Sequence, residues 1–405
     1  MRVSRREFLT TSAAFAIMPG TAAPISHTPG RQEGTQARPP ERFDPWIEVL
    51  PDALAHNVRT IRQLGGRPIL AVIKNHGYGL DFRVVARLLE PNPDVAGFAF
   101  VRAEEAVALR DAGISKPILL MARAPDHAVA ELAARRVTLS VYADDDPARM
   151  TAARARMPIE VHAYLDTGMS RMGIAFHRAL PFLRVVAATP ALRLTGAFMT
   201  FTEEADFDRE QRARFVSLAA EASAAGLSLG RLHAASSHSV FHHRDVGFDL
   251  VRPGIALYGG YPGDAAVERP LATLRPAFRL RARVTRTDRL RVGDSVSYGR
   301  RYIAREPTWV ATLPVGHGDG YPRDAVKGAR VLIGDTLYPV IGAVSASHCI
   351  IEVGAEERVR VGDVATLIGP DRPEIHPNAV AEVTGSVYDL LMHLNPTLPR
   401  VVAPS

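Results

Sequence analysis

The chain has 405 residues, which is more than one ordinary domain contains, so we expect two domains. Hydrophobic residues make up 47% of it and charged residues 23%, a balance typical of a globular protein with a large core. The net charge is +6, but the basic residues are dispersed and form no long block, so we predict no nucleic-acid partner. The single cysteine, Cys349, excludes a disulfide within the chain.

Residues 1–23 have the pattern of a twin-arginine signal peptide. The string SRREFL (4–9) precedes a mildly apolar run at 12–18, and small residues at 21–23 supply a cleavage site. The apolar run is much shorter than the roughly 20 residues needed to span a bilayer, so we predict no membrane anchor. We expect export to the periplasm, or a cytoplasmic location if the signal is not used. Residues 24–45, with five prolines and two glycines, are predicted to be a linker.

Short apolar runs alternate with amphipathic helical stretches between residues 46 and 275. Strands that are apolar throughout, each followed by a helix, indicate a parallel sheet covered on both faces. So many repeats in this length favour a (β/α)8 barrel over an open doubly wound sheet. The runs lie at 68–73, 95–101, 118–121, 137–141, 159–165, 194–199 and 232–235, with helical patterns such as 103–110 and 207–225 between them.

After Pro276 the pattern changes to that of short antiparallel strands. Residues 278–286 strictly alternate apolar and polar side chains, which is the period of a half-buried strand. The turn sequence Val-Gly-Asp occurs at 292–294 and again at 361–363. We therefore predict an α/β fold in which the barrel is followed by a second, mostly β domain at 276–405.

Lys74 is the first candidate for chemistry, because it directly follows the apolar run at 68–73. In a (β/α)8 barrel the carboxyl ends of the strands carry the catalytic groups. A lysine there can lose its charge through desolvation and attack an aldehyde. Position alone leaves open the simpler interpretation of an exposed lysine at a strand end.

Five strings in the chain resemble motifs of the alanine racemase family, and they occur in the family's order. They are AVIKNHGYG (71–79), LDTGMSRMG (165–173), VRPGIALYG (251–259), VSYGR (296–300) and PVGHGDGYP (314–322). The resemblance extends from residue 46 to the C-terminus. It implies a homodimeric enzyme that uses pyridoxal phosphate to racemise alanine or a broader set of amino acids.

The resemblance assigns two acid–base groups to opposite faces of the substrate. Lys74 would bind pyridoxal phosphate covalently and exchange the α-proton on one face. Tyr298, contributed by the partner subunit, would exchange it on the other. Racemisation needs this arrangement, because a planar carbanion must be reprotonated from the face opposite to proton removal. A free phenol has a pKa of about 10, so the surroundings of Tyr298 must lower that pKa or share the proton.

The resemblance also implies residues that hold the cofactor and the substrate. Arg252 would face the pyridine nitrogen and leave it unprotonated, supported by His233, and Arg171 would contact the cofactor's phenolic oxygen or the substrate carboxylate. The implied phosphate ligands are Tyr78, Ser237, the backbone amides of Gly254 and Ile255, and Tyr388.

Four positions depart from the family pattern. Tyr164 stands where the family often has a carbamylated lysine, and Phe201 where a histidine usually links the catalytic tyrosine to the pyridine-facing arginine. On the substrate side, His317 replaces a tyrosine at the gate and Ala346 replaces a methionine whose backbone amide meets the substrate carboxylate. We predict that His317 supplies a group titrating near neutral pH, and that Ala346 leaves room for larger substrates.

Other functions remain open from the sequence. The enzymatic alternative is a pyridoxal-phosphate aldolase or dehydratase acting on D-amino acids. A non-catalytic cofactor-binding protein and a cofactor-free barrel that binds sugars or peptides are two more. We predict no metal site, because adjacent residues such as His348 and Cys349 point to opposite faces of a strand and the pair His242–His243 lacks further ligand spacing.

Overall fold

The structure, a computed structural model, describes residues 44–243 and 248–404. The predicted signal peptide and nearly all of the predicted linker therefore lie outside the described residues. Among the helices that are described, none is both long and apolar enough to cross a membrane.

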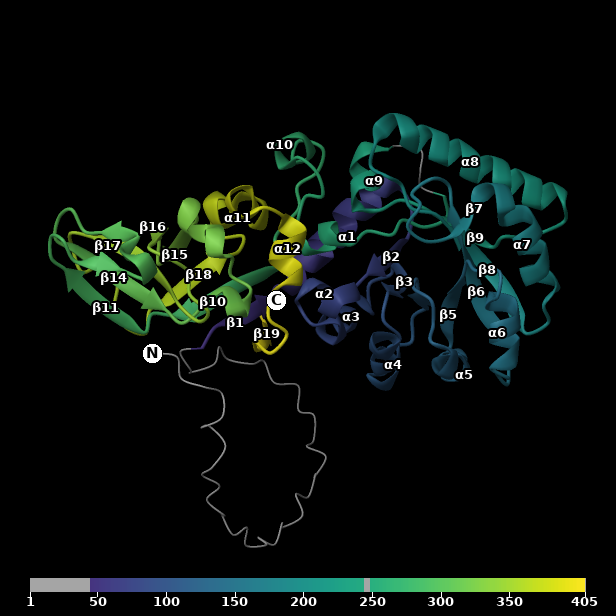
Figure 1. The fold of residues 1–405 in the computed structure, drawn as a ribbon, viewed down its shortest axis with the longest axis horizontal. Helices are drawn as coiled ribbons and strands as arrows, with labels where there is room; N and C mark the ends of the chain where they lie inside the picture. Colours follow the sequence, from purple (N-terminus) through teal and green to yellow (C-terminus); the bar gives the residue numbers. More distant parts are fainter. Residues whose placement is uncertain (1–43, 244–247, 405) are drawn as a thin grey trace, which may run out of the picture. The chain divides into compact units, whose positions relative to one another are not determined.

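The first half of the described chain forms a parallel sheet surrounded by helices (Figure 1). Neighbouring strands pair in chain order, and their side chains are largely buried, as expected for strands that are apolar throughout. The short strand β7 (Ile174–Ala175) pairs only with β6. The main strands are β2 (Ile69–Val72), β3 (Val95–Phe100), β4 (Ile118–Leu120), β5 (Val137–Val141), β6 (Ile159–Asp166), β8 (Leu192–Phe198) and β9 (Arg231–His233).

The segment 249–253 takes the eighth position and closes this sheet into a barrel. The N–H of Leu70 in β2 donates to the carbonyl of Val251 at 2.8 Å. On the opposite side, the N–H of Arg252 donates to the carbonyl of Ala235, just beyond β9, at 2.7 Å. The predicted (β/α)8 barrel is confirmed, and Arg252 lies in its eighth segment, between β9 and β2.

The barrel helices follow the strands as the sequence predicts. The patterns at 103–110 and 207–225 correspond to α4 and α8, with boundaries that differ by one or two residues. The helices of this half are α1 (Pro51–Gly65), α2 (Lys74–Tyr78), α3 (Phe82–Leu89), α4 (Ala103–Asp111), α5 (Val129–Ala134), α6 (Asp146–Ala152), α7 (Phe176–Ala188), α8 (Ala205–Ala224), α9 (Ser237–His242) and α10 (Ala265–Glu268).

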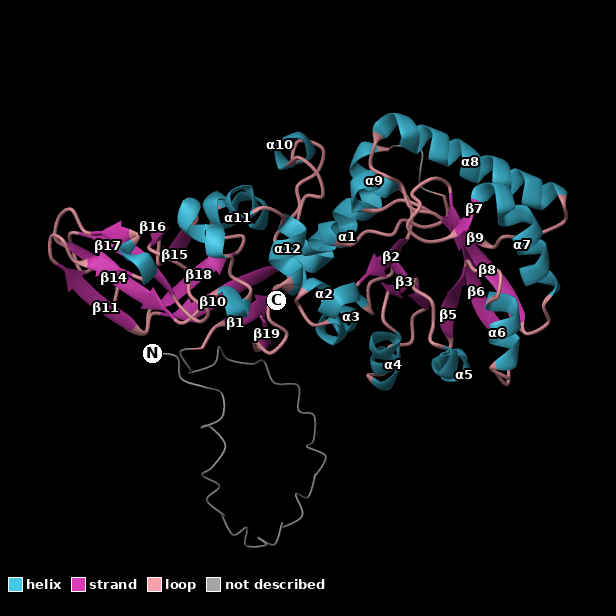
Figure 2. Ribbon diagram, viewed as in Figure 1, coloured by secondary structure: helices cyan, strands magenta, loops and turns pink. Residues whose placement is uncertain are grey.

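The second half is mostly β, as predicted, and its main sheet is antiparallel except at one edge (Figure 2). The strands run in the spatial order β11 (Arg286–Leu290), β14 (Thr308–Leu313), β17 (Cys349–Gly354), β16 (Thr336–Ile341), β15 (Arg330–Ile333), β18 (Val364–Ile368), β10 (Phe278–Arg283), β1 (Trp46–Val49) and β19 (Arg400–Val402). A separate pair is formed by β12 (Ser295–Val296) and β13 (Tyr302–Ile303), and the helices are α11 (Pro377–Thr384) and α12 (Val387–Met392).

Two details of this sheet differ from the sequence prediction. Strand β1, which lies within the range predicted for the barrel, pairs with β10 and β19 instead. The alternating run at 278–286 is not one strand, because β10 ends at Arg283 and β11 begins at Arg286. Within β10, buried and half-buried residues alternate as the period of two requires.

Candidate active site

Lys74 begins a left-handed turn directly after β2. Asn75, His76, Gly77 and Tyr78 all have positive φ, between 52° and 63°. This conformation costs roughly 1–2 kcal/mol for each residue that carries a Cβ, so the surrounding structure must hold it in place. The turn lets both Lys74 and Tyr78 line one cavity.

Contacts from distant parts of the chain fix this turn. Glu105 of α4 accepts a hydrogen bond from the backbone N–H of His76 at 3.0 Å. The guanidinium of Arg400 in β19 donates to the carbonyl of Gly79. A Cβ on Gly79 would lie 2.3 Å from the carbonyl oxygen of Leu391, so this position admits only glycine. The second half of the chain therefore helps to position the barrel lysine.

A cavity of about 420 Å³ opens at the carboxyl ends of the barrel strands. All the residues predicted to hold the cofactor line it, namely Lys74, Tyr78, Arg171, Ser237, Arg252, Gly254, Ile255 and Tyr388. Burial lowers the pKa of the Lys74 ammonium, and the positive charges of Arg171 and Arg252 lower it further. The neutral, nucleophilic amine is therefore available at a lower pH than in free lysine.

Arg252 is buried and ends a chain of hydrogen bonds that runs into the barrel. It donates to the carbonyl of Met199 at 2.8 Å and to Nδ1 of His233 at 2.7 Å. Because His233 accepts through Nδ1, its proton is on Nε2, which lies 2.9 Å from Nδ1 of His162. Burial lowers the pKa of both histidines, to about 4 for His162, so the two rings are neutral. The predicted support of Arg252 by His233 thus extends to a second ring.

Arg171 contacts a phenol in place of the family's carbamylated lysine. The Tyr164 hydroxyl accepts from Nη2 of Arg171 at 3.4 Å and lies 2.9 Å from Oγ1 of Thr200. The Tyr164 ring stacks on Phe198 with centroids 4.3 Å apart. Tyr164 therefore steadies Arg171 through its hydroxyl.

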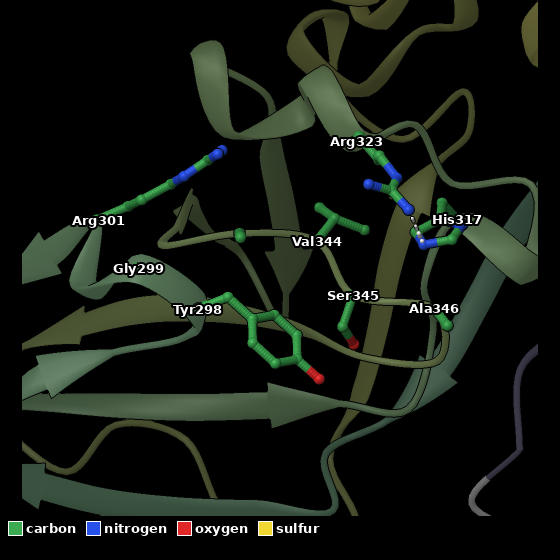
Figure 3. Close-up of a pocket in the computed structure, with 9 residues that line it drawn as sticks. Tyr298, Gly299, Arg301, His317, Arg323, Val344, Ser345 and Ala346 are labelled. Carbon is green, nitrogen blue, oxygen red and sulfur yellow. Dashed lines mark hydrogen bonds between the residues drawn. The ribbon is translucent and has the colours of Figure 1, made fainter. Parts of the chain in front are cut away.

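Tyr298 lines a different cavity, of about 410 Å³, in the second half of the chain (Figure 3). It begins the turn η3 (Tyr298–Arg300), and 78% of its surface is exposed. His317 and Ala346, the two substrate-side predictions, line the same cavity. Nε2 of His317 accepts a hydrogen bond from Arg323 at 2.8 Å, so that nitrogen carries no proton. Within one chain, Tyr298 and Lys74 thus line two different cavities.

Comparison with known families agrees with this geometry. The model described as "Alanine racemase, N-terminal domain" matches residues 49–262, and "Alanine racemase, C-terminal domain" matches residues 277–402. The chain belongs to the alanine racemase family. The alanine racemase of Desulfovibrio desulfuricans is 32% identical over 367 residues, which cover 88% of this chain and 97% of that protein.

Solved alanine racemases also share the fold. The enzyme of Clostridium difficile matches with a TM-score of 0.82 and 26% identity, over 89% of this chain and 95% of that one. The Bacillus anthracis alanine racemase, solved with bound L-Ala-P, matches with a TM-score of 0.81 and 28% identity, over 90% and 96% of the two chains.

The chemistry of the Lys74 cavity fits the pyridoxal phosphate that the family implies. A Cβ on Gly254 would lie 2.2 Å from the hydroxyl of Tyr78, so backbone and phenol meet there with no space for a side chain. The Ser237 oxygen accepts hydrogen bonds from the N–H groups of Gly254 (2.9 Å) and Ala256 (3.2 Å). The hydroxyl proton of Ser237 therefore remains free to be donated. These donors suit a phosphate, and the Lys74 amine suits an aldehyde.

Several site residues of this alanine racemase family member are not marked by any motif in the sequence. They are His162, Thr200, Glu203 and Arg323. A signal existed for His162, because it precedes Tyr164 by two residues in β6 and therefore faces the same side of the strand. Phe201, which replaces the family histidine, is buried against the ring of His243.

The histidine pair that was weighed as a metal site has protein partners instead. His242 lies 2.8 Å from Glu268, and His243 lies 2.8 Å from Asp208. Across residues 44–243 and 248–404, no group of three His, Cys, Asp or Glu side chains is arranged to hold a metal ion.

Proposed function

We propose that this chain is a pyridoxal-phosphate enzyme that racemises an amino acid by exchanging its α-proton on two faces. The observation that carries the proposal is the cavity in which the Lys74 amine, with its lowered pKa, faces two arginines and a set of phosphate donors. Similar proteins named alanine racemases make alanine the first substrate to test.

When bound, pyridoxal phosphate would supply the electron sink that stabilises negative charge at the substrate Cα. Tyr78, Ser237 and the backbone around Gly254 would hold its phosphate, and Arg252 would face its pyridine nitrogen. Burial lowers the pKa of Arg252 to about 10, which still leaves the guanidinium protonated at neutral pH. Arg252 therefore keeps its proton, and a pyridine nitrogen that stays unprotonated disfavours side reactions such as transamination.

The acid–base work is assigned to two atoms. Nζ of Lys74 would move the α-proton on one face of the substrate, and Oη of Tyr298 on the other. Since Tyr298 is exposed and lines a separate cavity, we propose that it enters the Lys74 cavity of a partner subunit in a homodimer. Arg171, steadied by Tyr164, would bind the substrate carboxylate or the cofactor's phenolic oxygen.

The test of the function is to measure cofactor uptake and alanine racemisation for the wild type and for Lys74→Ala. We expect visible absorbance and racemisation in the wild type and the loss of both in the variant. A wild-type protein that stays colourless with added cofactor, or a Lys74→Ala variant that racemises normally, would overturn the proposal.

Mixed dimers test where Tyr298 acts. Subunits carrying Lys74→Ala are unfolded, mixed with Tyr298→Phe subunits and refolded together. If each site combines Lys74 of one subunit with Tyr298 of the other, half of the dimers regain one intact site, and about a quarter of the wild-type activity returns. A mixture as inactive as each parent, while wild-type protein refolds with full activity, would mean that both groups come from one chain.

We also propose that the protein is exported by the twin-arginine route, on the strength of the string SRREFL and the residues that follow it. That route carries folded proteins, so the cofactor would be loaded before export. A reporter fused after residue 45 should reach the periplasm, and replacing Arg5 and Arg6 by Lys should retain it in the cytoplasm. A reporter retained with the intact sequence would contradict the proposal.

A further inference from the structure

One side chain in the Lys74 cavity has no role in the proposed chemistry. Glu203 lines this cavity together with Lys74 and Arg171, and it is the one carboxylate among the described lining residues. The other charged groups there are cations, which suit a phosphate and an α-carboxylate. A carboxylate would repel both of those anions, so Glu203 is suited to bind a cation instead.

The backbone holds Glu203 in an uncommon conformation. Its φ is +69°, which is rare for a residue with a Cβ and costs about 1–3 kcal/mol, so it persists only where neighbouring contacts enforce it. Here Asp208 accepts from the backbone N–H groups of Glu203 (3.1 Å) and Thr202 (3.0 Å), and Gln211 also accepts from Thr202 (2.9 Å). The buried side chains of α8 therefore fix the direction of this loop.

The carboxylate of Glu203 is not used by the protein itself. In the part of the chain that the structure describes, it makes no ion pair within 4.0 Å and no hydrogen bond, whereas Arg171 is already engaged with Tyr164. Glu203 is exposed in the single chain. Partial desolvation raises the pKa of its carboxyl and the negative charges of Asp208 and Glu268 raise it further, whereas His242 and Arg171 lower it. The negative charges of Asp208 and Glu268 favour a bound cation beside it.

We infer that Glu203 is a specificity-determining residue that recognises the cationic side chain of a basic amino acid, such as lysine or ornithine. This inference rests on the proposed racemase function and names its substrate class. The half-buried thioether of Met172 lines the same cavity and offers an apolar surface for methylene groups. Ala346, which lines the Tyr298 cavity, is smaller than the methionine that it replaces and leaves room for a substrate larger than alanine.

The test compares L-lysine with L-norleucine, whose aliphatic chain carries no charge. In the full-length enzyme loaded with cofactor, we expect kcat/KM to be at least about tenfold higher for lysine, because norleucine lacks the ammonium group that would form a charge-assisted hydrogen bond with Glu203. In Glu203→Gln, which keeps the shape and removes the charge, the ratio of the two values should fall at least about tenfold.

The matched control is Glu204→Gln. Glu204 caps α8 by accepting from the N–H groups of Asp206 and Phe207, and it does not line the cavity. Glutamine keeps an acceptor oxygen there, so the ratio of lysine to norleucine should remain that of the wild type. A ratio that falls equally in both variants would mean a general charge effect and would overturn the inference.

Binding gives a second readout that does not depend on turnover. The absorbance of the bound cofactor, titrated with lysine or norleucine, yields dissociation constants whose ratio should follow the same order. If alanine is racemised and lysine shows no advantage over norleucine, or if Glu203→Gln leaves the ratio unchanged, the inference fails while the proposed function stands. A protein that takes up no pyridoxal phosphate refutes the proposed function and the inference with it.

Discussion

Replacing Gly254 by alanine should damage the proposed phosphate site without touching a proposed catalytic group. The added Cβ would lie 2.2 Å from the Tyr78 hydroxyl, and a distance of at least 3.0 Å is needed, so the hydroxyl must move by at least about 0.8 Å. The ring has little freedom to turn away, because Tyr78 is only 3% exposed and stacks on Tyr258 with centroids 4.7 Å apart. The phenol would therefore lose the hydrogen bond that we propose it makes to the phosphate.

The size of the effect follows from the strength of that bond. A hydrogen bond to a charged group contributes about 1.5–3 kcal/mol, which corresponds to about 10- to 150-fold weaker cofactor binding. The assay is an absorbance titration of cofactor-free protein with pyridoxal phosphate. Tyr78→Phe removes the same bond directly, so the double variant should lose much less than the sum of the two single losses.

A control separates the loss of the bond from general strain. At Gly66 an added Cβ meets nothing within 4 Å, although φ is +63°, so Gly66→Ala should strain the backbone and leave cofactor affinity unchanged. The reasoning is refuted if Gly254→Ala binds the cofactor as tightly as the wild type, or if the double variant shows the full sum of both losses.

Three further variants test other parts of the site. Tyr164→Phe removes a hydroxyl that Arg171 contacts. We expect the free energy of unfolding to drop by about 1 kcal/mol and KM to rise more than kcat falls. A fall in kcat alone would contradict the role of Tyr164 in steadying Arg171. Arg171→Gln removes a cation that lowers the pKa of Lys74, so the pH midpoint for labelling that amine in cofactor-free protein should rise; a lower midpoint would contradict the electrostatic argument. His162 has a pKa of about 4 when folded against an ordinary 6.5, so the unfolded chain binds a proton that the folded chain refuses. The free energy of unfolding of the wild type should therefore drop by up to about 3 kcal/mol as pH falls from 6.5 toward 4. Urea titrations should show a smaller drop in His162→Gln, and equal drops in both proteins would refute the role of His162.

The barrel and its lysine were predictable because both depend on local patterns. Each barrel strand is an apolar run, and Lys74 directly follows one of them. Strand β1 was not predictable in this way. Its four residues are all buried, as in β2, and nothing in such a run says which sheet it joins. Its partners β10 and β19 lie more than 200 residues away in the sequence, so the pairing is a tertiary property.

The site could be predicted as far as the family motifs extend. Departures from those motifs required the structure. In the sequence, Tyr164 shows only that the family's lysine is absent, whereas in the fold its hydroxyl contacts Arg171. In the sequence, His317 is recognisable only as the replacement of a gate tyrosine, whereas in the fold Arg323 donates to its ring. Glu203 follows no motif, and its direction depends on a left-handed φ that Asp208 enforces.

The central claim is that Lys74 and Tyr298 act on opposite faces of one substrate. Its most direct test is α-proton exchange in deuterated water, followed separately for L- and D-alanine in Tyr298→Phe. We predict that this variant still exchanges the α-proton of one enantiomer, through Lys74, without forming the other. Exchange of both enantiomers at wild-type rates, or conversion between them, would contradict the account.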